Sequence, residues 1–468
     1  MTATAQRVPL PEGFAVSLDP STRTFCGGSV VLGGAPLRML RLTPRGREAW
    51  RALAAGLVRD RATGLLARRL VDAGTAHPRP PRTARPAVTV LVPVRDNPQD
   101  LERCLAAIGR DLPVVVVDDG SVDPGAVAAV CARHGARVVR RAVPGGPGAA
   151  RNAGLAEIET ELVAFLDSDC IPTPGWVSEL AGHFLDRRVG ACAPRVVGRA
   201  RSDPYGAAVA SPLDMGSREA AVAPMGPVPY VPTAALVVRR AALASGFDEA
   251  LRYGEDVDRV WRLVDAGWTV RYDPRVRVDH LEPRSERAAL VRRFRYGTSA
   301  APLSRRHPGR LAPAVLHPWS AAAVGLFAAR RPAAGAAVTA ATTVALVVTL
   351  VRAGVPLRAA IPVSSAAMGQ TVVGLGRAST QLALPLLAFA ASRGGSCRAL
   401  GLALLLAPPL VEASRARTVR NPLPYVAGEV AYGLGVWRGC VRERTLAPVL
   451  PRIVRATLPR TRVGSDGA

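Results

Sequence analysis

The sequence contains no lysine, so all 61 of its basic residues are arginine. Against 36 acidic residues this gives a formal net charge of +25. Such an excess favours anionic partners, namely nucleic acid, lipid headgroups or nucleotide phosphates. Aromatic residues make up only 4% of the chain, and the arginines are spread along it rather than gathered on one helix. Both features argue against a nucleic-acid-binding protein, and we expect no nucleic-acid partner.

Cysteine is scarce and scattered. The seven cysteines form no CxxC pair and no Cys/His cluster with metal-ligand spacing. We therefore expect small core residues in a reducing compartment. The N-terminus, MTATAQRVPLPEGF, has no apolar stretch of signal-peptide length, so we expect no secretion by that route. At 468 residues the chain is too long for one compact domain.

Composition and pattern divide the chain into five segments. Their bounds are 1–76, 77–86, 87–310, 311–440 and 441–468. The first combines short strand patterns with two helix patterns, one of which begins with Thr43 as a cap and Pro44 as first helical residue. The second, HPRPPRTARP, is predicted to be a linker, and the last a basic tail. The third alternates strand and helix patterns, which predicts an α/β domain with a doubly wound, mostly parallel sheet.

The fourth segment contains long uncharged stretches. Pro332–Val351 holds 20 residues without a charge, which matches the ~18–20 residues of a membrane-spanning helix, but it is rich in Ala and Thr. Helical hairpins in or on a membrane, with arginines at anionic headgroups, fit the pattern best, and a soluble Ala-rich bundle is the alternative. We expect a protein of the cytoplasmic membrane whose α/β domain faces the cytoplasm.

Two strands of the third segment end in paired acids. PVVVVDDG ends in Asp118 and Asp119, and LVAFLDSDC contains Asp167 and Asp169. The carboxyl ends of parallel strands meet at one edge of a sheet, where ligands bind. Carboxylates there suit a hard divalent cation, Mn2+ or Mg2+, that bridges to phosphate. A turn or a helix cap explains one such pair equally well, but two pairs in one sheet favour a functional role.

Three further features are ambiguous when each is taken alone. Arg151 and Asn152 open the helix after a Gly-rich turn, where a cation opposes the helix dipole unless it faces an anion or a polar ring. Glu255 and Asp256 begin another helix, where acids either stabilise the dipole or accept a proton from a substrate. His280 follows the strand VRVDH as a metal ligand or a lone histidine.

The order of these blocks is more specific than any one of them. From Ala87 to His280 the chain resembles the family-2 glycosyltransferases with a GT-A fold, through VVVVDDGSVD, GPGAARNAGL, VAFLDSDCIPTPGWV and YGEDVDRVWRLVDAGW. The basic N-terminal segment, the stretch RYGTSAAPLSRRHPG and the apolar tail resemble, more narrowly, the mycofactocin-system glycosyltransferases of actinobacteria.

The resemblance implies a role for each block. Nucleotide-sugar contacts would fall on Pro93, Arg95, Asp118, Asp119, Arg151, Asn152, Asp167 and Ser168. Within this set, Asp118 or Asp119 would bind uracil and Asp167 would contact the ribose. The metal ligands would be Asp169, Asp167 and His280. Asp256, with Glu255 beside it, would be the general base. Contacts to the leaving group and acceptor would fall on Arg292, Arg293, Arg295 and Tyr296.

The implied reaction is a metal-dependent, inverting hexosyl transfer from a nucleotide sugar. The narrower likeness implies UDP-glucose as donor and the peptide-derived premycofactocin redox cofactor as acceptor, extended as a short β-1,4-glucan. The N-terminal segment resembles winged-helix, PqqD-like modules, which implies a precursor-peptide or maturation partner. Processive relatives carry a Gln-x-x-Arg-Trp motif where this chain reads RRFRY, so long-chain processivity is not expected.

Two alternatives remain open from the sequence. A glycosyltransferase of the same fold that acts on a polyprenyl-phosphate or cell-envelope glycan acceptor would carry the same motifs. A nucleotidylyltransferase shares the sheet and the acidic metal ligands. It would need a Gly-rich loop with Arg and Lys after the first strand, where this chain reads VPVRDNPQDL. The second alternative is therefore the more distant one.

Overall fold

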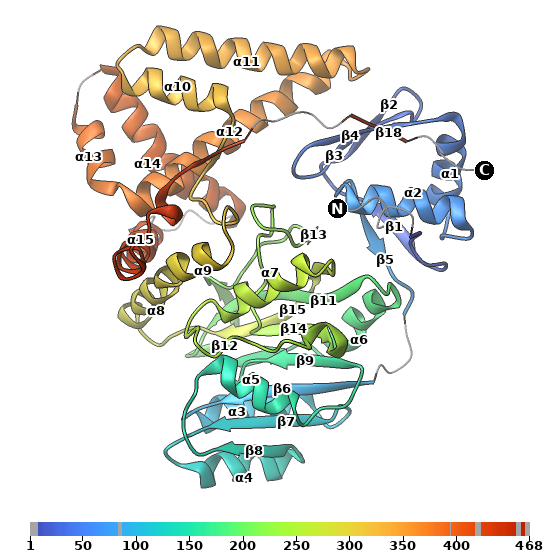
Figure 1. Cartoon of the computed structure of the whole chain (residues 1–468), viewed down its shortest axis with the longest axis vertical. Coiled ribbons are helices and arrows are strands. Elements are labelled where there is room, and N and C mark those ends of the chain that lie inside the picture. The colour runs from blue at the N-terminus through green and yellow to red at the C-terminus, as the bar shows by residue number, and fades with distance from the viewer. Residues whose placement is uncertain (1–7, 83–86, 394, 417–422, 455–459, 464–468) are drawn as a thin grey trace. The chain divides into compact units, whose positions relative to one another are not determined.

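The computed structural model of the chain describes residues 8–82, 87–393, 395–416, 423–454 and 460–463. The chain divides into two compact units (Figure 1). The first contains residues 1–23, 31–284 and 460–468, and the second contains residues 24–30 and 285–459. The expected boundary at residue 311 therefore falls inside the second unit, which already begins at residue 285.

The N-terminal part of the first unit is small and mixed. Its elements are β1 (Ala15–Leu18), β2 (Arg23–Phe25), β3 (Val30–Gly33), β4 (Arg38–Leu42), α1 (Pro44–Ala54), α2 (Arg61–Asp72) and β5 (Ala76–Arg79). The strand β18 (Arg460–Val463) runs parallel to β4, so part of the predicted basic tail is a strand of this sheet. Thr43 caps α1, as predicted, by accepting a hydrogen bond of 3.2 Å from the Gly46 N–H.

The predicted linker begins inside a strand. His77 to Arg79 belong to β5, which pairs antiparallel with β1 and so gives this Pro-containing segment backbone partners. Residues 83–86 of the predicted linker lie outside the described residues. A buried ionic cluster also ties β5 to the larger sheet, because Glu219 pairs with Arg79 at 2.8 Å and with Arg271 at 3.1 Å.

A ten-stranded mixed sheet forms the centre of the first unit (Figure 1). Its main strands are β6 (Val88–Val94), β7 (Val114–Asp119), β8 (Arg137–Arg141), β9 (Leu162–Leu166), β10 (Cys170–Pro172), β11 (Val189–Ala200), β14 (Ala235–Arg239) and β15 (Thr269–Leu281), with β12 (Asp203–Val209) and β13 (Ala220–Ala221) at the side. The order is β10-β15-β11-β14-β9-β6-β7-β8. Strands β9, β6, β7 and β8 are parallel, as are β11 and β15, whereas β14 and β10 run antiparallel to their neighbours. The predicted fold class, a mostly parallel α/β sheet, is confirmed.

Helices α3 (Pro98–Ile108), α4 (Pro124–His134) and α5 (Pro147–Leu155) follow the parallel strands β6, β7 and β8 at the predicted places. Helix α6 (Trp176–Ala181) follows β10, and α7 (Glu255–Asp265), which was also predicted, comes after β14. The side chains of Asn97 and Asp123 cap α3 and α4 by accepting backbone N–H groups, and a proline follows each cap. Gly135 ends α4 in the left-handed conformation at φ +68°, which favours glycine.

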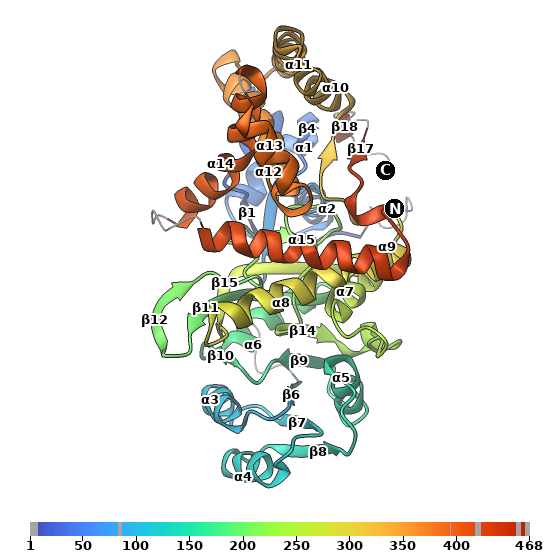
Figure 2. The same cartoon turned by 90° about the vertical axis from the view of Figure 1, so that its left-hand side faces the viewer.

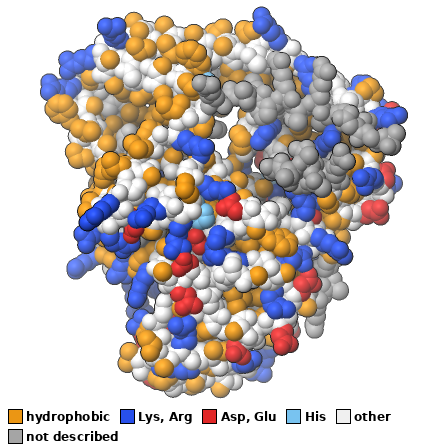
Figure 3. All heavy atoms as spheres, viewed as in Figure 1, with side chains coloured by type: hydrophobic (Ala, Val, Ile, Leu, Met, Phe, Trp, Pro, Cys, Tyr) orange, Lys and Arg blue, Asp and Glu red, His pale blue; other side chains and the backbone are white. Residues whose placement is uncertain are grey.

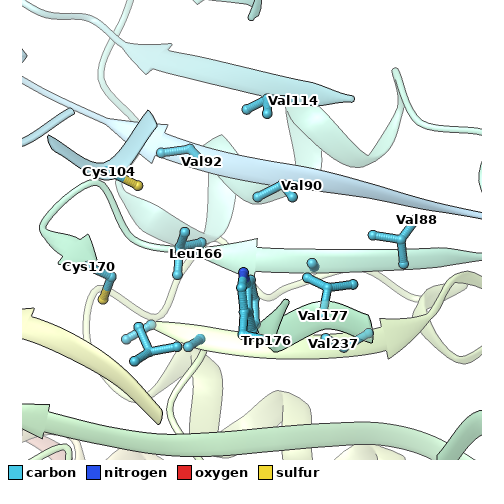
Figure 4. Packing of buried hydrophobic residues seen from close by; sticks show 14 of the residues in the cluster. Val88, Val90, Val92, Cys104, Val114, Leu166, Cys170, Trp176, Val177 and Val237 are labelled. Atoms are coloured by element: carbon cyan, nitrogen blue, oxygen red, sulfur yellow. The ribbon is translucent and has the colours of Figure 1, made fainter. Parts of the chain in front are cut away.

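Apolar side chains from the sheet and helices share one core. Figure 4 shows Val90 and Val92 of β6, Leu166 of β9 and Trp176 of α6 gathered together. None of these four is more than 3% exposed, and burying one such side chain contributes roughly 1.5–3 kcal/mol. Cys170 is fully buried in the same core, in agreement with a packing role. This packing fixes the strands and thereby the places where their polar ends emerge.

The second unit is almost entirely helical. Its elements are α8 (Glu286–Thr298), α9 (Ala300–Arg306), β16 (Val315–Leu316), α10 (Pro318–Ala328), α11 (Pro332–Arg352), α12 (Leu357–Leu382), α13 (Leu384–Ser392), α14 (Gly395–Ala416), α15 (Leu423–Glu443) and β17 (Arg452–Ile453). Helices α8 and α15 lie side by side (Figure 2). A Cβ on Gly297 of α8 or on Gly435 of α15 would overlap a backbone carbonyl of the partner helix. Glycine therefore permits their close approach.

One helix in the described part of the chain, α11, is long and apolar enough to cross a membrane, with a mean hydropathy of 2.0. The bent pair α12 and α13, which meets at 111°, makes a second candidate only if it is taken as one span. On the face seen in Figure 3, hydrophobic side chains gather over α10 to α14, with arginines at the margins. Both candidates are identified by their length and composition.

Candidate active site

The two acid pairs reach one edge of the sheet, as the sequence predicts. Strand β6 lies between β7 and β9 and runs parallel to both. Asp118 and Asp119 end β7, and Asp167 and Asp169 follow directly after β9. The carboxyl ends of neighbouring parallel strands thus bring four acids to the edge where ligands of such sheets bind.

Asp118 and Asp119 make contacts with the surrounding loops. Asp119 accepts hydrogen bonds from the backbone N–H groups of Gly145 at 2.9 Å and Gly146 at 2.7 Å. Asp118 accepts one from the Ser121 N–H at 2.9 Å and pairs with Arg140. Both carboxylates are buried, so they shape the loop before α5 and the turn after β7. Their part in binding a uracil ring stays a prediction.

Arg151 joins the strand end to helix α7. Arg151 is 2% exposed, and its Nη2 lies 2.8 Å from Asp167 Oδ1 while Nη1 lies 2.9 Å from Glu255 Oε1. It also lies 5.6 Å from the centre of the Phe247 ring. Burial alone would lower the pKa of Arg151, but the charges of Asp167 and Glu255 raise it. The two carboxylates therefore offset the cost of a cation in the first turns of α5.

Asp256 has the electrostatic setting of a base that works near neutral pH. Helix α7 begins directly after Gly254, whose φ of +81° turns the chain sharply. Desolvation of the carboxylate by neighbouring protein atoms and the charge of Glu255 raise the pKa of Asp256 to about 7. Burial likewise raises the pKa of Glu255. The Val257 N–H donates to Asp256 Oδ1 at 2.7 Å, which holds the carboxylate in place. A carboxylate with such a pKa can accept a proton from a hydroxyl.

Asp169 and His280 face each other across two paired strands. Cys170 of β10 lies opposite His280 of β15, and Asp169 Oδ2 is 3.5 Å from His280 Nε2. On the other side of the ring, His280 Nδ1 lies 2.9 Å from Glu282 Oε1. Burial disfavours the imidazolium, but Asp169 and Glu282 raise the pKa of His280 to about 9. A carboxylate at Nδ1 leaves Nε2 facing Asp169, the arrangement typical of metal-bound histidine.

These residues fit a divalent cation in part. Two neighbouring ligands of an octahedral ion, each about 2.1 Å from it, lie roughly 3 Å apart, close to the separation of Asp169 and His280. Asp167 stands beside them but has Arg151 on its Oδ1. Among the described residues no group of three or more His, Cys, Asp and Glu side chains is placed to hold a metal. A cation here would therefore need oxygens from a bound ligand as well.

The other residues predicted to bind the nucleotide sugar differ in their exposure and contacts. Arg95 follows β6, is half-exposed and lies 3.4 Å from Asp96. Pro93 is within β6, opposite Val117. Asn152 holds the backbone N–H and C=O of Phe247 at 2.8 and 2.9 Å, which fixes the loop before α7. Ser168 is partly buried between the two acids. Their contacts with a nucleotide stay predictions.

Three residues at the edge were missed in the sequence: Asp100, Arg201 and Glu282. Glu282 lies two positions after His280, and this spacing puts both on one face of an extended strand, which is a signal that could have identified it. Asp100 and Arg201 form an ion pair although they are 101 positions apart in the chain, and no local pattern marks Arg201.

The predicted acceptor residues belong to the second unit. Arg292, Arg293, Arg295 and Tyr296 all lie on α8. Arg293 Nη2 is 2.7 Å from Glu429 Oε1 of α15, and this carboxylate is 1% exposed. Arg293 thus helps to hold α8 against α15, and a role of this group toward an acceptor stays a proposal.

Comparison with known proteins agrees with this geometry. Residues 89–247 match the model of glycosyl transferase family 2. The chain belongs to the family-2 glycosyltransferases with a GT-A fold. Within them it resembles the mycofactocin-system enzymes, since it is 39% identical to the pre-mycofactocin glycosyltransferase of Mycobacterium tuberculosis H37Rv over 97% of this chain and 100% of the relative.

More distant relatives cover less of the chain. An N-acetylglucosaminyltransferase of Mesorhizobium japonicum is 29% identical over 46% of this chain and 56% of its own. Among solved structures, a mannosyltransferase of Pyrobaculum calidifontis in complex with GDP-Man and Mn2+ is similar at 20% identity, with a TM-score of 0.44 over 78% of this chain and 90% of the other.

Proposed function

We propose that the chain transfers glucose from UDP-glucose to premycofactocin, with inversion at the anomeric carbon, and adds a short run of β-linked glucose. The observation that carries this proposal is the connection from Asp256, whose pKa is raised to about 7, through Glu255 and Arg151 to Asp167 at the carboxyl edge of the sheet. The full-length similarity to a pre-mycofactocin glycosyltransferase supports the choice of acceptor.

In the proposed reaction Asp256 removes the proton of an acceptor hydroxyl as the oxygen attacks the anomeric carbon. The new bond joins this oxygen to the sugar, and the bond from the sugar to the diphosphate breaks, so UDP leaves with the electron pair. One displacement converts an α-linked donor into a β-glycoside. Arg151 keeps Asp167 and Glu255 in place beside the reacting groups.

A divalent cation belongs to the proposal. Asp169 and His280, with Asp167 beside them, would hold Mn2+ or Mg2+, and Glu282 would keep the imidazole turned toward it. When bound, the ion supplies charge that offsets the diphosphate leaving group.

We further propose that the second unit associates with the cytoplasmic membrane. Support comes from α11 and from exposed apolar side chains on α11 to α14, among them Val344, Ile361, Leu386 and Leu410. The same exposed surface favours, as a second candidate function, transfer to a polyprenyl-phosphate or cell-envelope glycan acceptor. Recovery of the protein wholly in the soluble fraction at high salt, without detergent, would contradict the membrane proposal. For the N-terminal part we propose a precursor-peptide or maturation partner.

The donor and the reaction are tested together. Purified protein with Mn2+ is incubated with a panel of UDP- and GDP-sugars, and nucleotide release is measured with premycofactocin, with a polyprenyl phosphate and without acceptor. We expect UDP-glucose with premycofactocin to give the highest rate. Asp256→Asn should abolish release, whereas Asp265→Asn, an exposed acid at the end of the same helix, should leave it intact. Equal rates for the two variants would exclude Asp256 as the base.

A further inference from the structure

Arg201 places a guanidinium among the acids of the candidate metal site. It lies in the turn between β11 and β12, and its side chain is only 17% exposed. Its Nε donates to the Glu282 carbonyl oxygen at 3.0 Å, and its Nη1 pairs with Asp100. Its Nη2 lies 3.5 Å from Asp169 Oδ2, longer than a good hydrogen bond. The contacts of the guanidinium with Glu282 and Asp100 are therefore short, whereas its contact with Asp169 is long.

Asp100 is the anchor of this arrangement. It lies in the first turn of α3, is 2% exposed, and also pairs with Arg103 at 3.1 Å. Because Asp100 has a second cation and a helix N-terminus beside it, its charge remains compensated when Arg201 shifts. Asp169, by contrast, is partly exposed at the edge of the sheet. The contact of Arg201 with Asp169 can therefore break while its ion pair with Asp100 remains.

One carboxylate oxygen lies between the side chains of an arginine and a histidine. Asp169 Oδ2 is 3.5 Å from Arg201 Nη2 and 3.5 Å from His280 Nε2. A divalent cation bound to this oxygen would stand close to the guanidinium, and like charges at that distance repel. A nucleotide diphosphate brings negative charge to the same place, and the planar fork of arginine suits phosphate oxygens.

We propose that Arg201 is a resident cation that neutralises Asp169 in the protein without donor and turns to the diphosphate of the donor when a divalent cation binds Asp169. This inference rests on the proposed function, because it takes a nucleotide sugar and a metal as the ligands of this edge. Arg201 then acts twice with opposite sign: it weakens binding of the metal alone and strengthens binding of metal and nucleotide together.

The test separates these two effects. Binding of Mn2+ alone to the full chain is measured by electron paramagnetic resonance, and binding of UDP at saturating Mn2+ by calorimetry. Arg201→Gln removes the charge and keeps a hydrogen-bond donor, Arg201→Lys keeps the charge, and Arg103→Gln is the matched control, since Arg103 also pairs with Asp100. Thermal unfolding verifies that each variant is folded.

We expect Arg201→Gln to bind Mn2+ alone about tenfold more tightly than the wild type and UDP with Mn2+ about tenfold more weakly, the size of one charge-assisted contact. Arg201→Lys should stay near the wild type for Mn2+, and Arg103→Gln for both ligands. If the wild type binds both ligands but Arg201→Gln binds Mn2+ no more tightly than the wild type does, this inference alone is overturned. Arg201 would then have only a structural role. A wild type that binds neither Mn2+ nor UDP overturns the proposed function and the inference with it.

Discussion

The guanidinium of Arg151 lies 2.8 Å from Asp167, and this buried contact joins helix α5 to the end of β9. The other arm of the same arginine reaches Glu255 at 2.9 Å, next to the proposed base. One side chain therefore connects the proposed donor edge to the proposed base. A change in position or charge at either place therefore alters the ion pair at the other.

Replacing Arg151 tests this connection. Arg151→Lys keeps the charge but cannot hold Asp167 and Glu255 at once, and Arg151→Gln leaves both carboxylates without their cation. Breaking a buried ion pair in this way costs about 3–5 kcal/mol, so we expect a lower Tm and a kcat reduced by about 100-fold or more. UDP release and thermal unfolding are the measurements. Arg137→Gln, which removes an exposed pair with Glu157, should change neither, and a fully active Arg151→Gln would contradict the connection.

The pH dependence follows from Asp256, whose pKa is raised to about 7 by its close surroundings and by Glu255. The base must be ionised, so kcat/KM should fall about tenfold for each pH unit below 7 and level off above it. A profile that is flat between about pH 5 and 8 would exclude a base with this pKa.

The raised pKa of Asp256 also affects how the stability of the fold depends on pH. The folded-state pKa of Asp256 lies above its ordinary value of 3.8, so its contribution is most favourable at low pH and is lost as the pH rises through about 7. Asp256→Asn removes a carboxylate that is costly to ionise. The Tm of this variant relative to the wild type should therefore rise between about pH 4 and pH 7 and stay level above that, measured by calorimetry. A Tm difference that does not change with pH would contradict the raised pKa.

Glu282 should matter for the metal without touching it. Glu282→Gln weakens the partner of His280 Nδ1, so we expect Mn2+ affinity in the presence of UDP to fall by about 10- to 100-fold. Glu286→Gln, at an exposed acid in the first turn of α8, is the control and should bind as the wild type does. Equal Mn2+ affinity in the two variants would show that Glu282 does not position the ligand.

The packing of α8 on α15 depends on glycine. A Cβ at Gly435 would meet the backbone of α8, so Gly435→Ala should destabilise the second unit and increase its proteolysis. Gly369 of α12 has nothing within 4 Å of a Cβ, and Gly369→Ala should instead be neutral or stabilising by about 0.5–1 kcal/mol. Equal proteolysis rates for the two variants would exclude a tight glycine contact.

The alternation of strands and helices and the place of the acids were predictable because they depend on neighbouring residues. Apolar runs such as Val88–Val94 and a cap such as Thr43 are local signals, and parallel strands bring their ends to one edge. The partners of Arg151 were not predictable, since they lie 16 and 104 positions away. The start of the predicted linker was misplaced because strand pairing with β1 outweighs the composition of Ala76–Arg79.

The product of the reaction tests the proposed glucosyl transfer and the proposed role of Asp256 as its base. Premycofactocin is incubated with UDP-glucose and the protein, and the acceptor is examined by mass spectrometry and by the anomeric coupling in its NMR spectrum. We expect one or more added hexoses in β linkage with the wild type and an unmodified acceptor with Asp256→Asn. Hexoses in α linkage, or the same product from Asp256→Asn, would contradict this proposal.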